Sequence, residues 1–137
     1  MKLTHLLTIV IMATPAQATE TLLAKGTFHG GNYAPSDTAS GGVTLVKLEN
    51  GHYELRLGDD FSTTPGPDLF VYLSAAADPA DGKAIKTNAF VDAGKLISPK
   101  GGQKLSLPAS FEPGKFKSAA IWCKQFGILF GAAALTQ

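Results

Sequence analysis

Short apolar or alternating segments of five to eight residues recur along the chain, separated by turn-forming residues. Strand character is found in residues 21–28, 42–48, 53–57, 68–74, 90–96, 103–107, 119–124 and 127–132. Turn signals at intervals of about 8–12 residues, without an amphipathic helical period, are typical of an all-β sandwich or closed barrel. The pattern predicts one antiparallel β-sandwich or barrel of about eight to nine short strands. Residues 75–82 can hold one helical turn. A longer helix is excluded there, because Pro79 and Gly82 would interrupt it.

The stretch 117–131 contains the only Trp and the only Cys of the chain. At a period of two residues, Ile121 and Cys123 point to one face of a strand, while Trp122 and the stem of Lys124 point to the other. Because both faces carry apolar side chains, we expect this strand to be covered on both sides. Any specific chemistry of the protein is expected near Cys123.

Asn50-Gly51 lies between the strands predicted at 42–48 and 53–57. Asn-Gly between such runs is the strongest short signal for a hairpin, because both residues tolerate the positive φ of a type I′ turn. We therefore predict a hairpin closed by a type I′ turn. His52 is expected to be solvated at its end.

The segment 58–68 gathers three carboxylates, those of Asp59, Asp60 and Asp68, with prolines, glycines and hydroxyl side chains. Oxygen ligands of this kind suit Ca²⁺, but the spacing does not match the alternating acids of an EF-hand. The favoured interpretation is that Asp59, Ser62 and Asp68 hydrogen-bond the local backbone as turn-formers. Asp68 abuts an apolar strand, so it is expected either to organise this loop or to face a site.

Residues 1–18 have the three parts of a secretory signal peptide: Lys2, an apolar run, and a small-residue pattern ending at Ala18. The run is well short of the ~20 apolar residues that span a bilayer, so cleavage after Ala18 and a periplasmic or secreted location are expected. Only Lys2 of the twelve basic residues is lost, which leaves eleven against eleven acidic residues in a 119-residue domain, 19–137. This balance argues against nucleic acid or an anionic membrane as partner.

The residue types exclude several familiar sites. A single Cys forms no intramolecular disulfide, and a c-type haem attachment needs two Cys followed by His. His29 and His52, which remain after cleavage, are not part of a Cys/His cluster, so we expect no metal site of the usual zinc spacing. His29 stands alone after its strand and is expected to be a solvated loop residue.

Four blocks of the sequence together closely resemble the DM thirteen (DM13) domain, over roughly Ala24 to Leu135. They are residues 61–73, 91–96, 121–126 and 130–133. The signature Cys of that family falls on Cys123, and its Gly-Pro-Asp block falls on Gly66, Pro67 and Asp68. Domains of this family are β-rich, extracytoplasmic and often adjacent to DOMON domains, and they are described as candidates for electron transfer.

The resemblance implies a redox role for Cys123, either as a free thiol or as a ligand to a prosthetic group such as haem. The second axial ligand would then be His29, His52 or water. A low thiol pKa needs a cation, and Lys124 points to the opposite face, so help would have to come from Lys117, Lys95 or a His. The expected protein is a monomeric electron-transfer component with a redox partner protein, rather than a turnover enzyme.

The alternative is a non-enzymatic binding or adhesion module. Free Cys is among the most buried residue types, so Cys123 would then be a small core residue beside Trp122, Phe126 and Phe130. Binding would use the loops 30–40 and 59–68 on a rigid β scaffold, with Tyr33 as an anchor.

Overall fold

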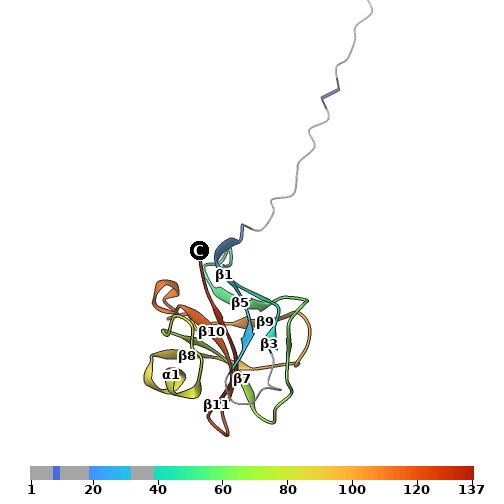
Figure 1. The fold of residues 1–137 in the computed structure, drawn as a ribbon. Helices are drawn as coiled ribbons and strands as arrows, with labels where there is room; N and C mark the ends of the chain where they lie inside the picture. Colours follow the sequence, from blue (N-terminus) through green and yellow to red (C-terminus); the bar gives the residue numbers. More distant parts are fainter. Residues whose placement is uncertain (1–7, 10–18, 32–38) are drawn as a thin grey trace, which may run out of the picture.

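The computed structural model describes residues 8–9, 19–31 and 39–137, and these residues form an antiparallel all-β fold (Figure 1). The predicted fold class is confirmed. The described residues form eleven strands where about eight to nine were predicted, because β2 (His29–Gly30), β3 (Ala39–Ser40) and β6 (Ser62–Thr63) have two residues each, too few to give a period in the sequence. In this part of the chain, no helix is long and apolar enough to cross a membrane.

Two sheets form the body of the domain. The four-stranded sheet has the order β1-β4-β5-β9, and the five-stranded sheet has the order β2-β11-β10-β7-β8. The first contains β1 (Thr21–Thr27), β4 (Gly42–Lys47), β5 (Tyr53–Leu57) and β9 (Gln103–Ser106). Besides β2, the second contains β7 (Leu69–Ser74), β8 (Phe90–Lys95), β10 (Ser118–Cys123) and β11 (Ile128–Ala134).

The two sheets are joined along one side by β1 and the end of β11. Lys25 and Thr136 exchange backbone hydrogen bonds of 2.9 Å, and the C-terminus lies beside β1 (Figure 1). At the β8–β9 connection, the Gln103 side chain accepts from the Ile97 amide at 2.9 Å and donates to the Ser98 carbonyl at 2.8 Å. Hydrogen bonds therefore link the two sheets at both sides. They also satisfy backbone donors and acceptors that would otherwise be unpaired at the edges of the sheets.

The main core lies between the two sheets and is formed by the side chains that point inward from each strand. Leu45, Leu55, Val71 and Ile121 are all almost fully buried there. Strand β10 is buried along its whole length, because its other face also carries apolar side chains. The prediction that this strand is covered on both sides is confirmed.

A smaller apolar cluster covers the outer face of the five-stranded sheet. Its buried members are Tyr72, Ile85, Ala120, Trp122, Leu129 and Ala132. Ile85 comes from the helix α1 (Gly82–Thr87), which lies beside β8 in Figure 1 and begins where the Asp81 side chain accepts a hydrogen bond from the Ala84 amide at 3.0 Å. One helical turn was expected within residues 75–82, but the helix starts only at Gly82, because Asp81 is a good N-cap. A single 3₁₀ turn, η1 (Pro113–Lys115), precedes β10.

The predicted hairpin is formed by β4 and β5, in the register Lys47 opposite Tyr53. The predicted type I′ turn is wrong. Among the described residues only glycines have positive φ, so Asn50 does not, whereas Gly51 has a φ of 86°. The Gly51 amide donates to the Leu48 carbonyl at 2.9 Å, which closes a four-residue turn, Leu48 to Gly51, whose last residue is the left-handed glycine. Gly51 alone therefore supplies the special backbone conformation. The solvent exposure expected for His52 is confirmed.

Gly51→Ala is expected to lower the free energy of unfolding by about 1–2 kcal/mol, because an L residue is strained in the left-handed region. A Cβ at this position would meet no atom within 4 Å, so a steric clash does not contribute. Gly51→Asn should cost less, since Asn tolerates this region. Urea unfolding of the mature domain measures both.

The matched control is Gly114→Ala, which also places its Cβ in open space but has no positive φ. This variant should leave stability unchanged or slightly raised. Equal losses for Gly51→Ala and Gly114→Ala would contradict the assignment of the cost to backbone strain.

Candidate functional site

Cys123 is the last residue of β10 and is fully buried, with 0% of its surface exposed. It lies opposite Leu69 of β7 on one side and Ile128 of β11 on the other. Its side chain belongs to the core between the sheets, as the alternation predicted. The thiol is therefore surrounded by apolar groups and sealed from solvent.

Lys124 is directed away from the thiol, as its position in the strand predicted. Its Nζ lies 3.3 Å from Asp92 Oδ2 and 4.6 Å from the centre of the Phe70 ring, both on the outer face of the sheet. Within the described residues, no ion pair or hydrogen bond reaches the Cys123 sulfur. The arrangement thus lacks the cationic partner that activates a thiol.

The Gly-Pro-Asp block packs over the end of β10 that carries Cys123. A Cβ on Gly66 would lie 2.9 Å from the Phe130 ring and 3.0 Å from Leu69, so a larger residue here would have to displace these side chains. The Asp68 carbonyl accepts a hydrogen bond from the Lys124 amide at 3.0 Å. Blocks that are far apart in the sequence therefore meet around one end of β10.

A small open cleft of about 210 Å³ lies between this block and the segment after β8. Its lining residues are Pro65, Gly66, Pro67, Leu69, Lys95, Leu96, Ile97 and Pro99. Leu69 lines this cleft, is 6% exposed, and is the cross-strand neighbour of Cys123 on the same face of the sheet. The Leu69 side chain therefore separates the cleft from the thiol.

Asp68 is half-buried, and among the described residues its carboxylate makes no hydrogen bond or ion pair. The backbone-binding role proposed for Asp59, Ser62 and Asp68 is taken by Asp60, whose Oδ1 accepts from the Gly42 amide at 3.0 Å.

The described residues contain no group of three or more His, Cys, Asp or Glu side chains placed to hold a metal ion. Phe61 and Thr63 are buried, so the middle of the 59–68 loop packs inward. Tyr33 and residues 32–38 of the other loop lie outside the described residues.

Trp122 lies on the opposite face from Cys123, within an aromatic group. Its ring centre is 6.1 Å from that of Tyr72, which is stacked on Phe90 at 4.6 Å and 3°. Desolvation by burial raises the pKa of Tyr72; the Asp92 charge adds to this rise and Lys124 opposes it. Phe126, expected beside Cys123 in a buried setting, is 60% exposed in the β10–β11 turn.

His29 is not the solitary solvated residue that the sequence suggested. Its Nε2 lies 2.6 Å from Asp78 Oδ1, and its Nδ1 lies 2.9 Å from the Gly30 carbonyl oxygen. Both partners are acceptors, so both contacts are hydrogen bonds only when both ring nitrogens carry a proton, as in the imidazolium form. The Gly30 carbonyl and then the Asp78 carboxylate raise the pKa of His29. The two residues are 49 positions apart, so no local pattern could reveal the pair.

A haem does not fit at Cys123. The sulfur is fully buried in a packed core, so the open space that an axial bond needs is not present beside it. Of the proposed second ligands, His29 has both nitrogens engaged, and His52 is exposed at the far end of the β4–β5 hairpin.

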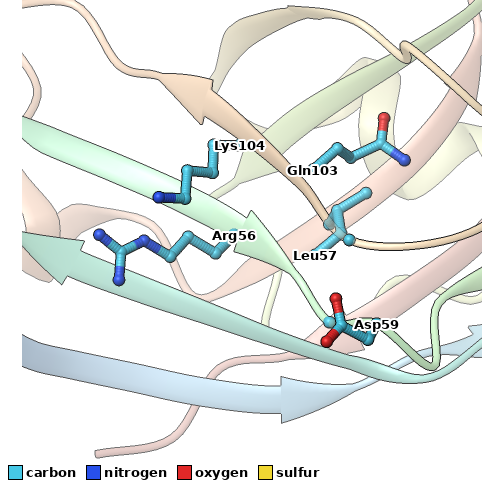
Figure 2. A pocket seen from close by; sticks show the side chains of 7 residues that line it. Arg56, Leu57, Asp59, Gln103 and Lys104 are labelled. Carbon is cyan, nitrogen blue, oxygen red and sulfur yellow. The ribbon is translucent and has the colours of Figure 1, made fainter.

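A second cleft lies on the outer side of the four-stranded sheet. Arg56 and Lys104 are directly opposite each other on β5 and β9, and their side chains extend in the same direction, while Asp59 lies toward the other end (Figure 2). Glu20 binds the Arg56 guanidinium through two bonds of 2.8 Å, and Glu54 adds one of 2.7 Å. The bonds from Arg56 lower the pKa of Glu20, and those from the two glutamates raise the pKa of Arg56. The guanidinium is thus neutralised by the chain itself, and this pairing of distant residues was not anticipated from sequence.

The pair His29–Asp78 predicts a pH-dependent contribution to stability. Because the folded pKa of His29 is raised, the contribution is fully present below the unfolded pKa of about 6.5 and disappears as the pH rises through the folded pKa. Asp78→Ala is therefore expected to cost at most about 1 kcal/mol at low pH, since both side chains are partly exposed, and little at higher pH.

Urea unfolding across pH 5 to about 9, a window chosen to span the histidine titration, measures this difference. The control is Glu49→Ala, which removes an exposed carboxylate from the β4–β5 turn. A cost of Asp78→Ala that stays constant over the range, or grows with pH, would show that the imidazolium is not its source.

One family model matches this chain. The family is described as electron transfer DM13, and the match covers residues 31–135, which include every block of the candidate site around Cys123. No curated protein and no solved structure matches the chain significantly. The resemblance predicted from the sequence blocks is confirmed, and the chain belongs to the DM13 electron-transfer family.

Proposed function

We propose that this protein is an exported electron-transfer domain in which Cys123 is the redox-active group. The observation that carries the proposal is the position of the thiol: it lies where the Gly-Pro-Asp block, β7 and β10 meet, inside the region matched by the family. Export is inferred from the signal peptide at 1–18. Both Met residues, Met1 and Met12, lie in that peptide, so cleavage leaves Cys123 as the only sulfur.

The chemistry open to a single thiol is limited. Cys123 as a thiolate can attack a disulfide of a partner, forming a mixed disulfide and releasing the other partner sulfur as a thiolate. Since the chain has no second Cys, a dithiol of a second partner must then attack the Cys123 sulfur, which releases the first partner as a dithiol, and close to its own disulfide, which frees Cys123 as a thiolate. Two electrons thereby pass from the dithiol of the second partner to the disulfide of the first.

Burial places a condition on this reaction. The Cys123 sulfur is sealed, so contact with a partner disulfide requires local opening. The cleft along residues 65–67 and 95–97 is the natural place for it, because Leu69 is both part of the cleft lining and a cross-strand partner of Cys123. A small displacement of Leu69 and the Gly66 segment would connect the thiol with solvent.

The test is the rate at which the native thiol reacts with a maleimide and with oxidised glutathione. Leu69→Ala should raise both rates at least about tenfold, because it removes the side chain between cleft and thiol. The matched control is Leu129→Ala, which truncates a leucine of 2% exposure on the opposite face of the same sheet. Both variants are expected to lose about 2–5 kcal/mol of stability, so stability alone does not separate them.

A faster reaction in Leu69→Ala than in Leu129→Ala supports access through the cleft. Equal acceleration in both variants, in proportion to their loss of stability, would mean that the thiol reacts only after global unfolding. The proposed attack of Cys123 on a partner disulfide through local opening at the cleft would then be wrong. Cys123→Ala supplies the blank for labelling. A visible absorption spectrum of protein purified from its export compartment tests separately for a bound chromophore.

The alternative of a binding module has weaker support. The middle of the 59–68 loop is packed inward through Phe61 and Thr63, and Asp60 is used to hold the Gly42 backbone. The accessible parts of that loop are the exposed Asp59 and Asp60 at its start, and Pro65, Pro67 and the half-buried Asp68 at its end, beside the cleft already assigned to the thiol.

A further inference from the structure

Three aromatic rings lead from the surface to the strand that carries Cys123. Phe90 is 48% exposed and is stacked on Tyr72 with 4.6 Å between ring centres, and the Tyr72 ring lies 6.1 Å from that of Trp122. Trp122 is joined to Cys123 by a peptide bond but faces the other side of the sheet. We infer that Tyr72 and Trp122 form a one-electron relay, which a redox partner reaches through the exposed Phe90 ring.

The inference rests on the proposed electron-transfer function, though not on a reactive thiol. Tyr and Trp are the side chains other than Cys that can lose one electron to a strong one-electron oxidant, whereas the Phe90 ring only provides contact. Trp122 is the only Trp of the chain, and among the described residues Tyr72 is the Tyr in ring contact with it. Both rings are almost fully buried, at 4% and 5% exposure, so their radicals would be shielded from solvent.

The charged neighbours of Tyr72 are engaged with other groups, and no hydrogen bond within the described residues reaches the Tyr72 hydroxyl, so its proton leaves to water. Asp92 is the cross-strand partner of Tyr72 on β8, and the two residues share the outer face of the sheet. The Asp92 carboxylate accepts from the Gly94 amide at 2.8 Å and faces Lys124 at 3.3 Å, which holds it in place. The charged groups that influence Tyr72 are Asp92, Lys124 and Asp68.

The oxidised one-electron centre of the partner takes one electron from Tyr72, and the phenolic proton passes to water, which leaves a neutral phenoxyl radical. Tyr72 and Trp122 can exchange this hole: Trp122 gives one electron to Tyr72 while water returns the proton to the phenolate oxygen, and the reverse step brings the hole back to Tyr72. A reduced one-electron donor then restores the ring that holds the hole. No bond between heavy atoms forms or breaks.

The chain contains its own control for this proposal. Tyr53 lies 5.4 Å from Phe111, which is stacked on Phe116 at 5.5 Å, so it also belongs to an aromatic group but has no Trp beside it. Tyr33, Tyr53 and Tyr72 are the three tyrosines of the chain. In a Tyr33→Phe background, a tyrosyl radical can therefore arise only on Tyr53 or Tyr72.

The experiment oxidises the mature protein in this background with a flash-generated ruthenium(III) tris-bipyridyl complex and identifies the radical by electron paramagnetic resonance. We expect a tyrosyl signal that Tyr53→Phe leaves unchanged. Tyr72→Phe should remove this signal and give a tryptophan radical in its place, which disappears when Trp122→Phe is added. A tyrosyl signal that survives Tyr72→Phe, or the absence of a tryptophan radical in that variant, would overturn the relay.

A second measurement separates this outcome from the fate of the proposed function. Electron exchange between the mature protein and soluble redox mediators is followed in the Tyr33→Phe background, in Tyr72→Phe and in Cys123→Ala. Loss of exchange in Tyr72→Phe supports the relay. Exchange that persists in Tyr72→Phe but is lost in Cys123→Ala refutes the relay and leaves the thiol function intact. If the Tyr33→Phe protein itself exchanges no electrons, both the relay and the proposed electron-transfer function are refuted.

Discussion

The two-sided burial of β10 is the constraint on which the rest of the structure depends. This strand is hydrogen-bonded to β7 and β11, and all six of its residues are buried. Its inner side chains require a facing sheet, and its outer side chains require the helix α1 and the rings of the outer cluster. Because side chains alternate along a strand, the neighbours Trp122 and Cys123 are separated into these two environments. The same alternation gives the thiol an apolar setting and gives the indole aromatic partners.

The sequence was a good guide wherever local chemistry decides the structure. The period of two located the longer strands and the face on which Cys123 lies, and Gly51 marked the β4–β5 hairpin. The turn type was missed because Asn50 tolerates positive φ without requiring it. Strands of two residues have no measurable period, and the short helix α1 is decided mainly by the cap at Asp81 and by the burial of Ile85.

The candidate site was predicted less well, because its contacts join residues that are distant in sequence. The family resemblance directed attention to Cys123 and Gly66, and the structure shows the Gly66 segment packed on Leu69, beside the thiol. No pattern in the sequence could place Asp78 against His29 or Glu20 against Arg56, since long-range ion pairs leave no periodic signal. His29 shows the consequence: its pKa is raised by two acceptors, of which one, Asp78, comes from the loop between β7 and α1.

Burial of the thiol gives the two proposed routes of electron transfer different physical costs. The route in which the Cys123 thiol reacts directly with a partner must displace the packed Leu69 side chain. Its rate therefore depends on a local unfolding equilibrium, and so on temperature and denaturant. The relay through the aromatic rings leaves the core closed and depends on the spacing of Phe90, Tyr72 and Trp122, which the native packing already fixes. Conditions that stabilise the fold therefore suppress the first route and preserve the second. A domain of this kind can pass electrons while fully folded only if the rings, rather than the sulfur, meet the partner.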